Sequence, residues 1–211
     1  MKECQHDILK RVMEVFSAYG IRSLSMDNIA QYIPLSKRNL LKIAKNKEDL
    51  IRQIFEYRIA LAQDIKQKSE QNTNTENVID EIVHGMRAMY HVNREIGLQL
   101  EFELYKYYPR IFAEYTTIRK QHIIEYLRDN IERGKQQGIY HDYLETEQTA
   151  KQIFKNNKEL IQTHMQQHMI NNEYNQEEII NKCINAMIEK LANEKGKEYF
   201  NKQTESHTKR T

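Results

Sequence analysis

The sequence predicts an all-α protein, and three observations support this fold class. The chain of 211 residues contains only two prolines and six glycines, so turns are few and the runs between them are long. Glu, Lys, Gln, Ile, Leu and Met recur throughout these runs, and most of them favour helices. Apolar residues also recur at helical spacing. We therefore expect about nine helices rather than many short strands.

The N-terminal segment predicts two helices separated by a short loop. Residues 3–19 carry apolar residues at helical spacing, and Gly20 follows where a glycine commonly ends a helix. Ser25 precedes the segment 26–33 and can cap it as a second helix. This second helix ends before Pro34, because the residue that precedes a proline is displaced from the helical region.

Seven further helices follow on the same criteria. Ser36 caps a third helix that extends to about Ala44, and the fourth runs over 47–69. The polar, aperiodic segment 69–77 is the best candidate for a joint between a head and a body. Beyond it we expect helices at 78–92, 96–108, 111–138, 146–171 and from Gln176 onward, and a polar, fraying tail from Lys195.

Positive charge is concentrated near the N-terminus. The net charge of the chain is +2, yet five basic residues and no acid lie between Ser36 and Lys47. Such a basic stretch is either a solvated surface or a surface for nucleic acid. The absence of a balancing acid favours the second interpretation.

The second and third helices fit a helix-turn-helix, in which the second helix of the pair enters the major groove of DNA. The small Ala30 allows a close crossing, and the apolar residues between the two helices are Ile29, Ala30, Ile33, Leu35, Leu40 and Ile43. The predicted DNA-binding residues are Ser25, Ser36, Lys37, Arg38, Asn39, Lys42, Lys45 and Lys47. Of these, residues 37–39 are expected closest to base edges, and Ser25 and Lys47 at the phosphate backbone.

Residues 8–56 resemble the N-terminal domain of the tetracycline-repressor (TetR) family of bacterial regulators. The matching features are Phe16, Gly20, Ser25, the pair Ile29–Ala30, the pair Ser36–Lys37 and the segment NKEDL at 46–50. The resemblance implies an all-helical homodimer with a DNA-binding domain at 1–48, a ligand-binding and dimerisation domain at 49–200 and a polar tail at 201–211. It also implies that Lys47 meets a phosphate and that the last two helices form a four-helix interface.

The sequence departs from the family pattern in and around the third helix. Pro34 occupies a turn position that is usually glycine, and Arg38 replaces a small residue. Leu41, Ile43 and Ala44 stand where a tyrosine and an aromatic pair are common. Because that tyrosine often touches phosphate, one backbone contact is missing, and Arg38 can replace it.

Two further sets of residues are candidates for the body's functions. Aromatic and methionine side chains suit a mostly apolar effector, although simple core is the alternative; the candidate pocket residues are Met86, Met89, Tyr90, Phe102, Tyr105, Tyr107 and Tyr108. The candidate dimer interface comprises Phe154, Ile161, His164, His168, Ile180, Ile184, Met187, Ile188 and Leu191. His164 and His168 are four residues apart, but two ligands do not complete a metal site.

The remaining patterns exclude other functions. We find no nucleophile triad, phosphate loop or carboxylate pair in a recognisable context, so an enzyme is disfavoured, and no metal or cofactor is expected. No stretch of eighteen apolar residues and no signal peptide is present, so a cytoplasmic protein is expected, with no contact to membranes. Cys4 and Cys183 lack the spacing of a zinc site.

The leading hypothesis is a ligand-responsive repressor that binds a palindromic double-stranded DNA operator as a homodimer and responds to a small-molecule effector. The alternative is a helical ligand-binding or interaction protein whose basic head no longer reads DNA.

Overall fold

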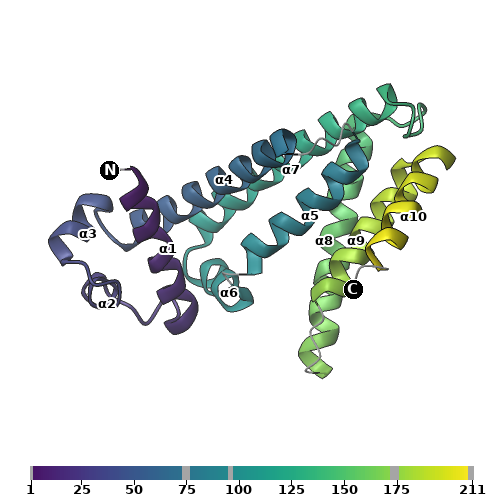
Figure 1. The fold of residues 1–211 in the computed structure, drawn as a ribbon. Coiled ribbons are helices and arrows are strands. Elements are labelled where there is room, and N and C mark those ends of the chain that lie inside the picture. Colours follow the sequence, from purple (N-terminus) through teal and green to yellow (C-terminus); the bar gives the residue numbers. More distant parts are fainter. Residues whose placement is uncertain (1, 73–76, 95–96, 172–175, 209–211) are drawn as a thin grey trace. The chain divides into compact units, whose positions relative to one another are not determined.

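The structure, a computed structural model, describes the backbone of residues 2–72, 77–94, 97–171 and 176–208 and the side chains of 5–64, 77–88, 100–163 and 177–204. Over these residues the chain forms helices and no strand, which confirms the all-α prediction (Figure 1). The helices are α1 (Lys2–Tyr19), α2 (Met26–Tyr32), α3 (Lys37–Ile43), α4 (Lys47–Asn72), α5 (Val78–Arg94), α6 (Gly97–Tyr107), α7 (Pro109–Gln136), α8 (Thr146–Asn171), α9 (Gln176–Leu191) and α10 (Glu194–Thr208).

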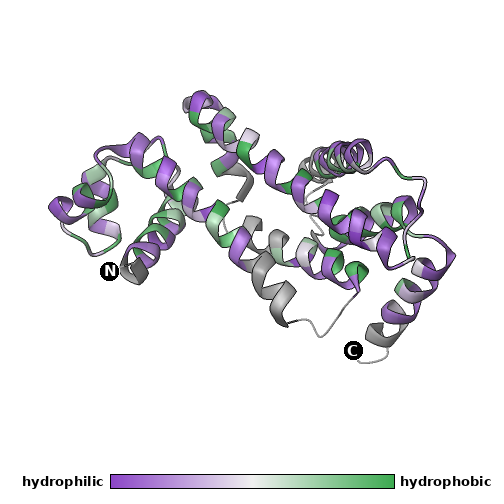
Figure 2. Ribbon diagram, turned by 90° about the horizontal axis from the view of Figure 1, so that it is seen from above, coloured by the Kyte–Doolittle hydropathy of each residue, from purple (hydrophilic) through white to green (hydrophobic). Residues whose placement is uncertain are grey.

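The chain divides into two compact units that share three helices. The first unit comprises Met1–Gln67 and Ala88–Arg119, and the second comprises Lys68–Arg87 and Lys120–Thr211. Helices α4, α5 and α7 therefore contribute to both units. Hydrophilic and hydrophobic residues alternate along the helices, as expected for amphipathic helices that each bury one side (Figure 2).

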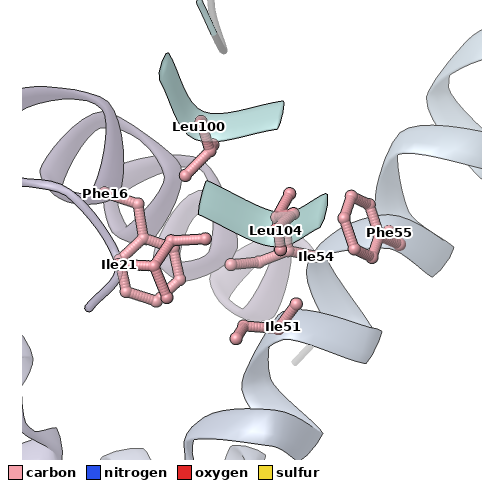
Figure 3. Close-up of a pocket in the computed structure, with 7 residues that line it drawn as sticks. All are labelled: Phe16, Ile21, Ile51, Ile54, Phe55, Leu100 and Leu104. Carbon is pink, nitrogen blue, oxygen red and sulfur yellow. The ribbon is translucent and has the colours of Figure 1, made fainter. Parts of the chain in front are cut away.

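The core of the first unit joins the N-terminal helices to α4 and α6. Its buried residues include Val12 and Phe16 of α1, Ile29 of α2, Leu40 of α3 and Leu104 of α6. Seven apolar side chains converge around a cavity of about 10 Å³, namely Phe16, Ile21, Ile51, Ile54, Phe55, Leu100 and Leu104 (Figure 3). A cavity of this size and composition holds no ligand, so it is a packing void of the core.

The loop between α1 and α2 is held by a lysine from the start of α4. Gly20 adopts a φ of +76°, which a glycine tolerates best, and the loop then buries Ile21 and Leu24. The Lys47 Nζ donates hydrogen bonds to the carbonyl oxygens of Ile21 at 3.0 Å and Leu24 at 2.8 Å. Burial lowers the pKa of this half-buried lysine, and the nearby charge of Glu103 opposes the shift.

Helix α6 supplies a second attachment to the same loop. The backbone N–H of Arg22 donates to the Glu103 Oε2 at 3.0 Å, and the Arg22 Nη1 donates to the Tyr107 hydroxyl at 3.1 Å. The Arg22 guanidinium also lies over the Tyr107 ring, 4.8 Å from its centroid. The loop from which α2 departs is therefore bound on two sides by charged or polar side chains.

The second unit contains a helix that the sequence analysis did not predict. The segment after Lys195, expected to be a polar tail, instead forms most of α10 and packs against α9. The Tyr199 hydroxyl donates to the Asp80 carboxylate at the start of α5. The composition of the segment is polar because this helix uses only a narrow face, including the half-buried Tyr199 and Phe200, for contact.

Buried polar groups link α5 to α7 in this unit. The carboxylate of the buried Glu81 accepts from the Arg133 Nη2 at 2.8 Å, and the buried Asn130 Nδ2 donates to the carbonyl oxygen of Val78 at 2.9 Å. The Tyr140 hydroxyl donates to the Asn130 Oδ1 at 3.0 Å, and burial raises the pKa of this tyrosine. These groups have partners inside the protein, as buried polar groups require.

The observed helix boundaries lie within three residues of the expected ones, apart from the added helix α10. Helix α7 begins at Pro109 rather than at 111, because a proline fits the first helical position, where its missing N–H is not needed. None of the described helices is long and apolar enough to cross a membrane.

Gly134→Ala should destabilise the protein, although Gly→Ala within a helix usually stabilises it by about 1 kcal/mol. A Cβ at Gly134 would lie 2.1 Å from the Cδ2 of the buried Tyr140 ring, so the change overpacks the core. We expect the free energy of unfolding to fall by about 1 to 3 kcal/mol in denaturant titrations. The exposed Gln136→Ala is the control, and a Gly134→Ala protein more stable than the wild type would contradict this packing.

Lys47→Ala should also destabilise the protein, because it leaves two loop carbonyl groups without their donor. We expect a loss of about 1 to 3 kcal/mol in the free energy of unfolding. Lys42→Ala is the matched control, since Lys42 is exposed on α3. Equal unfolding midpoints for the two variants would show that the Lys47 hydrogen bonds do not hold the loop.

Candidate nucleic-acid interface

Helices α2 and α3 form the predicted pair, and each begins with the expected serine cap. The Ser25 side chain accepts from the backbone N–H of Asn28 at 3.2 Å, and the Asn28 Oδ1 accepts from the Ser25 N–H at 3.0 Å. The Ser36 hydroxyl accepts from the backbone N–H of Asn39 at 3.2 Å. Between the helices, the Leu35 N–H donates to the Ala30 carbonyl oxygen at 3.1 Å and closes the turn.

One face of α3 is locked into the core of the first unit. Leu40 and Ala44 are buried, and Ile43 is partly buried against the same cluster. The Ile43 carbonyl accepts from the Gln53 side chain, and the Lys45 N–H donates to the Asp49 carboxylate at 2.8 Å. These contacts, made by the last residue of α3 and by the segment just after it, determine which face of α3 is turned toward the core.

The opposite face of α3 presents the predicted polar residues to solvent. Ser36, Arg38, Asn39, Lys42 and Lys45 are all exposed. The structure thus brings together the basic residues that the spacing placed on one side of the helix. A rigid helix with an exposed basic face can lie along a polyanion without rearrangement.

Lys37 is exposed but has an acidic partner that the sequence analysis missed. Its Nζ lies 2.8 Å from the Asp27 Oδ2, and both side chains are more than half exposed. The twelve residues 36–47 carry no acid, yet the preceding helix supplies one. Because exposed ion pairs contribute little, Lys37 can exchange this partner for a phosphate at small cost.

Lys47 is engaged within the protein, unlike the exposed basic residues of α3, and its predicted role at a phosphate stays a prediction. Its ammonium group is half-buried beneath the α1–α2 loop and bonded to two carbonyl oxygens. The lysine points inward because the loop folds back over the start of α4. Nothing in residues 46–50 alone indicated this, since the acceptors lie more than twenty residues earlier.

The residues predicted for the ligand pocket differ in how far the structure buries them. Phe102 and Tyr105 are 60% and 65% exposed, so they neither line a closed cavity within their unit nor belong to its core. Tyr107 and Tyr108 are half-buried, and Tyr107 is bonded to Arg22. The half-buried Met86 belongs to the second unit, and the side chains of Met89 and Tyr90 lie outside the described residues.

A larger hollow of about 300 Å³ lies on the second unit between α9 and α10. It is lined by Asn185, Ile188, Glu189, Lys197, Phe200 and Asn201. Of the predicted pocket residues whose side chains are described, none lines this hollow or the cavity of the first unit. The effector site therefore stays a prediction without an assigned cavity.

The α9 stripe that was assigned to a dimer interface is already covered within one chain. The five residues concerned, Ile180, Ile184, Met187, Ile188 and Leu191, are all buried. The stripe is covered because α8 and the unpredicted α10 both pack against α9, and the dimer interface stays a prediction. Burial also raises the pKa of the Cys183 thiol in this stripe to about 11, so the thiol stays protonated at neutral pH.

The α8 residues of the predicted interface differ from those of α9. Phe154 is half-buried, and Ile161 is 39% exposed. The side chains of His164 and His168 lie outside the described residues. Among the side chains that are described, no three His, Cys, Asp or Glu gather as a possible set of metal ligands.

Comparisons of the sequence with family models and with curated proteins find no match for this chain. Comparison of the structure does find similar folds. A transcriptional regulator from Cytophaga hutchinsonii ATCC 33406 has a TM-score of 0.72 at 15% identity, over 88% of this chain and 97% of that chain.

Two further solved structures are similar over nearly their whole length. A TetR-family transcriptional regulator from Cytophaga hutchinsonii has a TM-score of 0.68 at 13% identity, over 91% of this chain and 96% of that chain. A protein from Saccharomonospora viridis, assigned as a transcriptional regulator and solved in complex with choline, has a TM-score of 0.67 at 15% identity, over 92% and 100%. At these identities the similarity concerns the fold alone. The chain therefore has the fold of the TetR-family transcriptional regulators.

Proposed function

We propose that this chain is a DNA-binding transcriptional regulator in which α3 enters the major groove of duplex DNA. The observation that carries the proposal is the two-sided character of α3. Leu40 and the C-cap residue Ala44 anchor one side in the core, while Arg38 and Lys42 are exposed on the other. A helix held in this way by a preceding helix and a tight turn is the arrangement that helix-turn-helix proteins insert into the groove.

Within this proposal the residues in and around α3 fall into two groups, those that bind phosphates and those that contact base edges. Lys42 lies in the last turn of the helix and Lys45 follows its end, and their long side chains suit phosphate oxygens. Arg38 and Asn39 lie in its first turn, which approaches base edges in this arrangement. Arginine can bind guanine and asparagine can bind adenine through paired hydrogen bonds.

We further propose that the regulator is a repressor that acts as a homodimer on a palindromic operator and responds to a small-molecule effector. The similar fold of the Saccharomonospora viridis protein, which is bound to choline, supports an effector of small size. A twofold dimer would present two α3 helices to two half-sites about one helical turn apart. The rival function is that of a helical ligand-binding or interaction protein whose basic head no longer reads DNA. This rival function is favoured if the protein binds no DNA duplex.

Selection from a random duplex library should recover related sequences that contain repeated half-sites. On the selected site, Lys42→Ala should weaken binding to all sequences alike and reduce the magnitude of the salt slope by about 0.9, the value for one phosphate contact. Asn39→Ala should instead cost about 1 to 3 kcal/mol on the selected site and relax the preference at one base pair. Fluorescence anisotropy over a salt series measures both quantities.

Lys195→Ala is the control, since Lys195 is an exposed lysine of the second unit. Its salt slope should match that of the wild type. If no sequence is enriched, or if neither α3 variant changes affinity or selectivity, α3 is only a solvated surface and the rival function stands.

Ile161→Asp should convert a dimer into monomers and lower operator affinity with it. Ile161 is an exposed apolar residue of α8, and a charge there would be unpaired at an interface. Sedimentation at several concentrations measures the oligomeric state.

Ile184→Asp supplies the contrast to that variant. Ile184 is 2% exposed in the single chain, so its replacement by aspartate should lower the unfolding temperature whatever the protein concentration. A dimer that persists in Ile161→Asp would place the interface elsewhere.

A further inference from the structure

Leu41 is an apolar residue on the exposed side of α3. It is 41% exposed, whereas its neighbour Leu40 is fully buried. Successive residues of a helix are rotated by about 100°, so the core that takes Leu40 cannot also take Leu41. Leu41 therefore contributes little to the packing of the first unit.

A single exposed leucine is ordinary on a protein surface, but the surroundings of this one are not. Leu41 follows Lys37 and Arg38 by four and three residues, so the three share one side of the helix. Lys37, Arg38 and Lys42, the residue after Leu41, are exposed and basic. Leu41 is thus the apolar member of a surface that is otherwise suited to a polyanion.

The chemistry of base edges suggests what such a residue would contact. Thymine carries the C5-methyl group in the major groove, and an apolar side chain can contact it there. Leucine has no hydrogen-bond donor or acceptor, so it cannot hold a phosphate or a polar base edge. If α3 contacted only phosphates, the Leu41 side chain would remain in solvent and would have no role in binding.

We propose that Leu41 reads the C5-methyl group of a thymine and is a specificity-determining residue of the DNA site. This inference rests on the proposed function, because it requires α3 to enter the major groove. The neighbouring lysines and Arg38 hold the helix against the DNA, and the position of Leu41 midway along the helix brings its methyl groups to one base step.

The test replaces each thymine of the selected site in turn by deoxyuridine, which removes only the C5-methyl group. For the wild type we expect one position in each half-site at which this replacement lowers affinity by about fourfold, the value for one buried methyl-sized group. Other thymines should tolerate the replacement. Leu41→Ala should bind the thymine and uracil sites with equal affinity at that position.

Lys42→Ala is the matched variant on the same helix. It should bind both sites more weakly and keep the ratio between thymine and uracil that the wild type shows. Leu41→Ala should unfold at the wild-type temperature, because Leu41 is exposed, so a loss of binding is not a loss of folding.

The outcomes separate the inference from the function on which it rests. If no duplex is bound specifically, the proposed function and this inference both fail. If a site is selected but no thymine responds to uracil, or if Leu41→Ala keeps the wild-type ratio, only the inference about Leu41 is overturned.

Discussion

The anchoring of the α1–α2 loop is the constraint on which the arrangement of the first unit depends. This loop is the point from which α2 and α3 depart, and hydrophobic contact alone would leave its backbone groups unsatisfied. Lys47 provides donors for two carbonyl oxygens, and Glu103 accepts from the Arg22 N–H. Because the charged groups are partly removed from water, these hydrogen bonds are stronger than neutral surface ones. They attach the loop to α4 and α6 at once, so the orientation of the helix pair is determined by residues outside it.

This constraint explains why charges of similar appearance in the sequence act differently. Lys47 donates to carbonyl groups of the loop, and Lys37 is paired with Asp27. Arg38 and Lys42 of α3 and Lys45 just after it remain exposed. Arg38 and Lys42 therefore present their charges on α3 for a polyanion to meet. Leu41 within that basic face adds no charge, and its exposed apolar side chain gains from contact with another apolar group rather than with a phosphate. In the proposed complex with DNA, such a surface would combine sequence-independent attraction with a local selectivity.

The second unit depends on a different balance, in which a largely polar helix is held by a few specific contacts. Helix α10 covers the α9 stripe, and Tyr199 attaches it to Asp80 at the start of α5. The cost of burying the carboxylates of Asp80 and Glu81 is offset because each has a donor, Tyr199 for the first and Arg133 for the second. With α9 covered inside the chain, an exposed apolar residue such as Ile161 becomes the better candidate for contact with a second subunit.

The sequence by itself determined the helical class, the boundaries of α1 to α8 to within three residues, the caps at Ser25 and Ser36, and the two-sided character of α3. These features are local, because they depend on spacing, capping and turn chemistry over fewer than about ten residues. Only the tertiary structure decided which lysines reach solvent, that α10 is a helix, and that the α9 stripe is buried within one chain. Those outcomes depend on partners 23 to 119 residues away, such as the Leu24 carbonyl for Lys47 and Asp80 for Tyr199, and periodicity carries no information about such distant contacts.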